Sequence, residues 1–287
     1  MRLSLRLLCI TLLCAGIAAS PSTKIGPDFR SAGINIAKIS SNKGGSPGPK
    51  YFHESSFNNH YDGRFGSEEM LEEKSLPYLR ALIQTYLVTM KDLGVATWIM
   101  HGTLLGWWWN QKIMPWDADI DVQVTEPGIH FLAQYYNMTE HHFDLPGIPG
   151  GRTYVLDVNP NYNVSSTNDY DNVIDARWID KTSGLYIDIT AVRPDDKRRE
   201  KGETGALICK DSHQYQEEDL FPLRDSLFEG VPVKIPFAFV KLLTDEYGKN
   251  SITGTRYNGY TFNEEAQLWI RDDVNDKLTK AQQYQRS

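Results

Sequence analysis

Apolar residues recur at helical spacing between residues 67 and 94. Ser67 can cap the start of a helix, and Gly94 suits its end. The repeated apolar positions would share one face of that helix; they are Leu79, Leu82, Ile83, Tyr86 and Met90. Pro77 interrupts the segment, and proline disrupts helix interiors. The pattern therefore predicts a short first helix and a longer second helix, which packs its apolar face on a core.

Beyond Gly94, apolar and alternating runs predict strands separated by helices. The strands are expected at residues 95–100, 118–124, 153–158, 172–180 and 184–192. The helices are expected at residues 102–109, 128–137 and 236–248, with a weaker one at 264–285. This order of helices and strands predicts an α/β or α+β domain.

The N-terminal third differs in composition from the rest of the chain. Residues 1–20 have a basic start, with Arg2 and Arg6, then an apolar run and small residues, which is typical of a secretory signal peptide. The run is shorter than the ~20 residues of a membrane span, and a short signal anchor is the alternative. Residues 21–66 are rich in Gly, Ser and Pro and predict a flexible arm. A single domain is expected over residues 67–287.

Charge and cysteine content narrow the class of protein. The 287-residue chain carries a formal charge of −7, so a nucleic-acid-binding role has no electrostatic support. Of the three cysteines, only Cys209 lies outside residues 1–20, which predicts a buried thiol and no internal disulfide. Glycosylation sequons at Asn137 and Asn163 agree with a protein of the secretory pathway.

Three aspartates alternate with apolar residues in "WDADIDVQV". In a strand, Asp117, Asp119 and Asp121 would share one face, while Ile120 and Val122 would face the core. Carboxylates two residues apart lie about 7 Å apart along a strand and repel each other unless a cation neutralises them. An acidic edge strand in water is the plainer interpretation, but it does not need the interleaved apolar residues. The pattern therefore favours a site for Mg²⁺ or Mn²⁺.

Two further features suit a phosphate-binding site. Asp188 lies between Ile187 and Ile189 in another predicted strand, so it is a candidate third ligand. Gly102 and Thr103 follow a predicted strand and open a helix, where backbone N–H groups favour anions. Strand, Gly-Thr turn, helix and acidic strand follow one another in the order of nucleotidyltransferase-type cores.

Three blocks of sequence resemble the LicD family, which includes the fukutin-related proteins. They are "HGTLLGWWWNQKIMPWDADIDVQV" (101–124), "DARWIDKTSGLYIDITAV" (175–192) and "DLFPLRDSLFEGVPVKIPFAFVKLLTDEYG" (219–248). The first block is similar to that of fungal mannosylphosphorylation proteins of cell-wall glycan synthesis. The resemblance implies a nucleotidyltransferase-like mixed sheet flanked by helices.

The resemblance also implies an activity and its residues. The expected reaction transfers a sugar-phosphate from a nucleotide-activated donor, GDP-mannose or a CDP-linked alcohol, to a glycan hydroxyl on a glycoprotein or glycolipid. Asp119, Asp121 and Asp188 would hold the metal, and Asp188 would also accept the proton of the acceptor hydroxyl. Gly102 and Thr103 would face phosphate, with Asp117 in support. The expected location is the Golgi lumen or membrane, with secretion if the leader is cleaved and membrane association through the N-terminus otherwise.

The roles of other residues, and the reaction itself, stay open at this stage. Arg177 and Lys181 are candidate cations for the leaving nucleotide, and surface or strand-end charges are their plainer role. His101 is a candidate phosphate contact or a structural histidine, and Trp116 would stack on sugar or base or belong to the core. A glycosyltransferase that uses Asp-x-Asp, or a non-catalytic regulator of a mannosylphosphate transferase, are the alternative functions.

Overall fold

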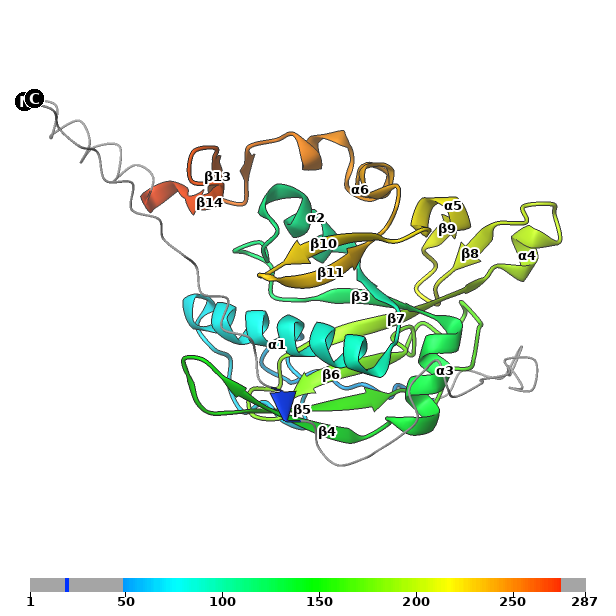
Figure 1. The fold of residues 1–287 in the computed structure, drawn as a ribbon, viewed down its shortest axis with the longest axis horizontal. Helices are drawn as coiled ribbons and strands as arrows, with labels where there is room; N and C mark the ends of the chain where they lie inside the picture. The colour runs from blue at the N-terminus through cyan, green and yellow to red at the C-terminus, as the bar shows by residue number, and fades with distance from the viewer. Residues whose placement is uncertain (1–18, 21–48, 275–287) are drawn as a thin grey trace, which may run out of the picture.

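A mixed sheet forms the centre of the protein. The computed structural model describes residues 19–20 and 49–274. Within these residues the sheet has the strand order β1-β4-β5-β6-β7-β3-β2, and β8 and β9 extend it from β7. These strands span Ala19–Ser20 (β1), Thr97–Ile99 (β2), Asp121–Thr125 (β3), Thr139–Leu145 (β4), Ile148–Val158 (β5), Ala176–Asp180 (β6), Tyr186–Pro194 (β7), Ala206–Ile208 (β8) and Gln214–Gln216 (β9). The predicted α/β class, with a mixed sheet flanked by helices, is confirmed (Figure 1).

Helices cover one face of this sheet and its ends. They span Glu72–Leu93 (α1), His101–Asn110 (α2), Glu126–Tyr135 (α3), Asp196–Arg199 (α4), Glu217–Leu220 (α5) and Phe239–Tyr247 (α6). Helix α1 crosses the sheet (Figure 1), and all five apolar residues predicted for its inner face are at most 2% exposed. Gly94 ends α1 in the left-handed conformation. The predicted break at Pro77 is wrong, because α1 continues through it.

The opposite face of the sheet is covered by residues 49–66, which lie within the predicted arm. Phe52 and Tyr61 are buried, and Phe65 packs against Val155, Ile179 and Tyr186. The Asp62 backbone N–H donates to the Gly184 carbonyl over 2.7 Å. Residues 49–66 therefore pack on the sheet formed by the segment that was predicted to be the domain. Residues 21–48 and all of the predicted leader except Ala19–Ser20 lie outside the described residues.

Smaller elements follow the sheet along the chain. A hairpin pairs β10 (Arg224–Phe228) with β11 (Val231–Ile235), and a 3₁₀ helix, η2 (Lys249–Ile252), follows α6. A three-stranded sheet is formed by β12 (Arg256–Tyr257), β13 (Tyr260–Asn263) and β14 (Leu268–Arg271). The predicted helix at 264–285 is therefore wrong over β14, and its residues 275–285 lie outside the described part. The segment from α6 to β14 lies beside α2 (Figure 1).

Two further predictions concern the cysteine and a membrane-spanning segment. Cys209 is a buried free thiol, as predicted. Within residues 19–20 and 49–274, no helix combines the length and the apolar character that a membrane crossing requires.

Candidate functional site

The predicted acidic residues gather where β3 begins. Asp121 is the first residue of β3, whereas Asp117 and Asp119 lie in the loop that joins α2 to β3. The strand therefore starts three residues later than expected, and strict strand alternation does not align the three carboxylates. They nevertheless line one cleft of about 430 Å³. Asp119 is exposed, while Asp117 and Asp121 are half-buried.

Asp188 lies beside Asp121 in the sheet. Strands β3 and β7 are parallel neighbours, and Asp121 and Asp188 are direct partners in their register. The Asp188 N–H donates to the Ile120 carbonyl over 3.0 Å, which continues the pairing to the loop. Directly opposed residues of neighbouring strands project their side chains to the same face. The structure therefore brings Asp188 together with the acids of the first block.

Burial, with the neighbouring carboxylates, raises the pKa values of Asp117, Asp121 and Asp188. Burial, followed by the charges of Asp119 and Asp188, raises the pKa of Asp121 to about 7, although His101 opposes the shift. Burial and the neighbouring Asp119 raise the pKa of Asp117 well above its ordinary range. Burial also raises the pKa of Asp188, despite the nearby Arg177. Carboxylates with raised pKa values are costly to ionise side by side, and a bound cation removes that cost.

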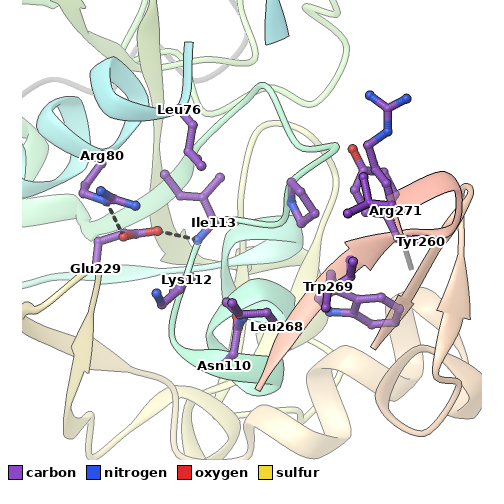
Figure 2. Close-up of a pocket in the computed structure, with 13 residues that line it drawn as sticks. Leu76, Arg80, Asn110, Lys112, Ile113, Glu229, Tyr260, Leu268, Trp269 and Arg271 are labelled. Atoms are coloured by element: carbon purple, nitrogen blue, oxygen red, sulfur yellow. Dashed lines mark hydrogen bonds and ion pairs between the residues drawn. The ribbon is translucent and has the colours of Figure 1, made fainter. Parts of the chain in front are cut away.

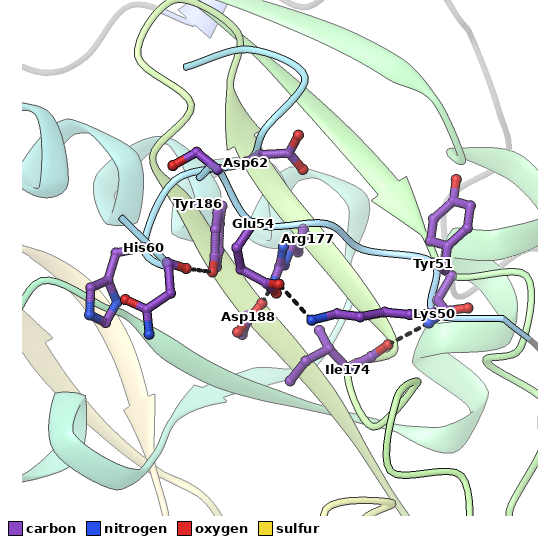
Figure 3. Close-up of polar contacts among 12 residues, drawn as sticks. Lys50, Tyr51, Glu54, His60, Asp62, Ile174, Arg177, Tyr186 and Asp188 are labelled. Atoms are coloured by element: carbon purple, nitrogen blue, oxygen red, sulfur yellow. Dashed lines mark hydrogen bonds and ion pairs between the residues drawn. The ribbon is translucent and has the colours of Figure 1, made fainter. Parts of the chain in front are cut away.

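Arg177 holds Asp188 in place (Figure 3). The Arg177 Nε–H donates to Asp188 Oδ1 over 2.7 Å, and Nη2 donates to Glu54 Oε1 over 3.0 Å. The guanidinium lies between two rings, with its central carbon 3.7 Å from the centroid of Tyr186 and 4.7 Å from that of Phe52. Its side chain is 3% exposed. Arg177 therefore orients the Asp188 carboxylate and ties residues 49–66 to the site.

The start of α2 supports the acidic loop. The Thr103 hydroxyl accepts a 2.9 Å hydrogen bond from the Asp121 N–H. A Cβ at Gly102 would lie 3.1 Å from Asp117 Oδ2, and one at Gly106 would lie 2.4 Å from the Lys112 carbonyl oxygen. Both glycines therefore allow α2 to pack directly against the loop, which a larger residue at position 106 would displace.

Aromatic residues also line the cleft. Trp116 packs against Tyr257, Tyr260 and Trp269 with ring centroids 5.1–5.2 Å apart. Trp109 also contacts Trp269, and its Nε1–H donates to the Ser251 carbonyl over 2.9 Å. Trp116 thus belongs to a small cluster of its own and still lines the acidic cleft. The cleft is therefore lined by both carboxylates and aromatic rings.

Arg256 is the cation of this cleft. It lies on β12, it lines the same cavity as Asp117, Asp119 and Asp121, and it is exposed. In the described part of the chain, its guanidinium has no hydrogen-bond or ion-pair partner. The predicted cations are differently placed: Arg177 is paired with Asp188, and Lys181 pairs with Glu140 over 2.6 Å at the other end of β6.

A second cavity of about 430 Å³ lies on another side of Trp269 (Figure 2). Its polar centre is Glu229, which accepts from Arg80 Nε over 2.7 Å and from the Ile113 N–H over 2.8 Å. Asp117, Asp119, Asp121 and Asp188 are all absent from its lining. Glu229 therefore connects Ile113, in the loop that leads to the acids, with Arg80 on α1.

Several residues near the acids could not be found from sequence patterns. Glu54 lies in a segment with the composition of a linker, and Glu246 lies in the last turn of α6. His213 lies in an irregular segment, and Arg256 lies on the two-residue strand β12. His101, by contrast, was a candidate; its Nδ1 lies 2.8 Å from Glu246 Oε1. Of the sequon residues, Asn137 is exposed and its Oδ1 accepts from the Val158 N–H over 2.9 Å, while Asn163 is half-buried.

Comparison with known proteins identifies the family of this chain. Residues 94–238 match the family described as "LicD/FKTN/FKRP, nucleotidyltransferase domain". Mannosyltransferase regulator 4 of Saccharomyces cerevisiae is 38% identical over 136 residues, which is 46% of this chain and 11% of that protein. Mannosyltransferase regulator 14 of the same yeast is 32% identical over 154 residues, which is 50% of this chain and 16% of that protein.

A mammalian relative matches over a shorter stretch. Ribitol-5-phosphate transferase FKTN of Mus musculus is 40% identical over 45 residues, which is 16% of this chain and 10% of that protein. The matched segments thus span less than a fifth of each relative. Because the family match covers half of the chain and includes Asp188 and the three acids of the cleft, the chain belongs to the LicD family.

Proposed function

We propose that this protein is a metal-dependent transferase of the secretory pathway, which moves a sugar-phosphate, with mannose phosphate as the expected group, from a nucleotide-activated donor to a glycan hydroxyl. The observation that carries the proposal is the cleft that Asp119 and Asp121 share with Arg256, together with Asp188, which is paired with Asp121 in the neighbouring strand. The mouse relative is named a ribitol-5-phosphate transferase, which supports transfer of a phosphate-linked group. The names of the yeast relatives support a link to mannose.

The donor set fits a hard divalent cation. Carboxylate oxygens are the ligands that Mg²⁺ and Mn²⁺ take in proteins. The raised pKa values of Asp121 and Asp188 reflect a site where burial disfavours negative charge, and a cation offsets that cost. Asp119, Asp121 and Asp188 would hold the ion. When bound, the metal neutralises charge on the donor diphosphate and on the leaving nucleotide.

The protein's own groups would bind and orient the two substrates. Arg256 lines the same cleft as the acids and can pair with donor phosphate. Trp116 and Tyr257 offer ring faces for the base or the sugar. Arg177 occupies Oδ1 of Asp188 and leaves Oδ2 to face the ligand or the acceptor hydroxyl. A donor bound between the acids and the rings would displace water from the cleft, and electrostatic contacts are stronger where water is excluded.

A donor screen tests this function. The full chain would be incubated with Mn²⁺, an acceptor glycan and a panel of GDP- and CDP-linked donors. Release of a nucleoside monophosphate is expected, because the sugar leaves together with its phosphate. Release of a nucleoside diphosphate would mean a glycosyltransferase. If the protein shows neither turnover nor metal-dependent donor binding, a regulatory function would be favoured. The two yeast relatives are named as regulators.

Replacing Arg256 with glutamine should weaken donor binding. The substitution removes the positive charge and keeps a polar side chain, so the Michaelis constant for the donor should rise about tenfold. The turnover number should change little, because the lost contact is made in the ground state as well as in the transition state. Arg271→Gln is the matched control, since Arg271 lines the second cavity instead. Steady-state kinetics that give the two variants equal Michaelis constants would remove Arg256 from the donor site.

A further inference from the structure

Two histidines and a glutamate meet beside the acidic cleft. His101 starts α2, His213 directly precedes β9, and Glu246 lies in the last turn of α6. Each residue offers one ligand atom, and these atoms all lie within 4.8 Å of one another. Three separate elements thus converge on one point. The charges of His101 and Glu246 act on Asp121, so this cluster and the acidic site are neighbours.

A carboxylate lies against each imidazole, although His213 Nδ1 has no hydrogen-bond partner in the described part of the chain. His101 Nδ1 lies 2.8 Å from Glu246 Oε1, and His213 Nδ1 lies 3.1 Å from Asp211 Oδ2. His101 Nδ1 and Glu246 Oε1 face each other, as two ligands of one ion would, and His213 supplies the third ligand atom. His101 Nε2 is buried and has no hydrogen-bond partner among residues 19–20 and 49–274. The two ring centroids are 4.4 Å apart, with the planes tilted by 47°.

From this arrangement we propose that His101, His213 and Glu246 form a binding site for a transition-metal ion, with Zn²⁺ as the expected occupant. Two histidines and one glutamate are a ligand set that zinc uses when one position stays open. Ligand atoms about 2.0–2.2 Å from zinc lie roughly 3–4 Å apart, so small side-chain rotations close the set. The site differs from the acidic one in kind, because imidazole nitrogen favours zinc over magnesium.

The surrounding charge also suits a dication. Asp211 and Glu246 approach the two rings, and Asp121 adds a third carboxylate nearby. A hydrogen-bonded His101–Glu246 pair without metal is the simpler interpretation of the same contacts. It does not explain the approach of the two imidazoles or the unpartnered His213 Nδ1. A bound ion uses both.

Zinc binding by the full chain tests the proposal. After removal of metal with a chelator, equilibrium dialysis with Zn²⁺ measures affinity, and Co²⁺ in its place gives a visible absorption spectrum that reports imidazole ligation. We expect His213→Gln and Glu246→Gln each to weaken Zn²⁺ binding at least about tenfold and to lose the Co²⁺ spectrum. His142→Gln is the matched control, because His142 is an exposed histidine on β4 and should bind zinc as the wild type does.

Asp119→Asn separates this site from the proposed transferase site. The variant should keep full Zn²⁺ affinity and the Co²⁺ spectrum, whether or not the protein transfers phosphate-linked sugars. Wild-type affinity in both His213→Gln and Glu246→Gln would overturn the proposal. Loss of zinc in Asp119→Asn alone would also overturn it, since the carboxylates would then be the metal's only ligands.

Discussion

Asp119→Asn should abolish metal-dependent transfer, with turnover falling at least about a thousandfold. Asp119 is exposed in the cleft and lies between Asp117 and Asp121. Asparagine keeps the size of the side chain and removes the charge that would hold the cation. Because Asp119 is not part of the packed core, the fold should not change.

Product formation and circular dichroism measure the two halves of this expectation. Asp225→Asn is the matched control, because Asp225 is 88% exposed on the β10–β11 hairpin and pairs with Lys234. The control should keep full activity. Retained turnover in Asp119→Asn, with the fold intact, would remove Asp119 from the chemistry.

Asp175→Asn should cause the largest loss of stability, about 3–5 kcal/mol. The Asp175 carboxylate is fully buried and accepts from Arg193 Nη2 over 2.9 Å and from the Ala191 N–H over 2.8 Å. Lys210 Nζ lies 3.1 Å from Asp175 Oδ1. Asparagine would leave two buried cations, Arg193 and Lys210, without their shared counter-charge. Urea unfolding measures the change, and Asp144→Asn, at an exposed position of β4, should leave stability unchanged.

The loss should depend on pH in a defined direction. Burial raises the pKa of Asp175, but the charges of Arg193 and Lys210 outweigh it and hold the pKa below its ordinary value. A lowered pKa in the folded state contributes stability above the unfolded value of about 4, and this contribution disappears as the pH falls through the folded value. The difference between wild type and Asp175→Asn should therefore be constant near neutral pH and shrink below about pH 4. A difference that stays constant into acid would contradict the ionic origin.

The main sheet was predictable because its strands are apolar and regular. The run around Asp188 gave both a strand and an acid on one face, and β7 confirms the strand. Strand β4 was missed, although buried and exposed residues alternate along all seven of its positions. Two adjacent histidines and two acids hid that pattern, since none of them counts as apolar in a sequence window.

Contacts between distant segments were not predictable. Arg177 meets Glu54 across 123 positions of sequence, and no local pattern links an arm of linker composition to a buried arginine. The C-terminal strands were not predicted, for a related reason. Strand β14 is four residues long and follows acidic and glutamine residues that suit a helix, but Trp269 draws it into the cluster with Trp116.

Thermal unfolding of wild type and Asp121→Asn, with and without Mn²⁺, tests the convergence of the acids most directly. Burial and neighbouring acids raise the pKa of Asp121 to about 7. The folded state therefore holds a proton that the unfolded state releases near pH 4, and its stability falls as the pH rises between these values. Without metal at pH 8, Asp121→Asn should be the more stable protein by about 1–2 kcal/mol. Mn²⁺ should stabilise the wild type above the variant. A variant that is less stable without metal, together with an equal Mn²⁺ effect on both proteins, would mean that these carboxylates do not share a cation site.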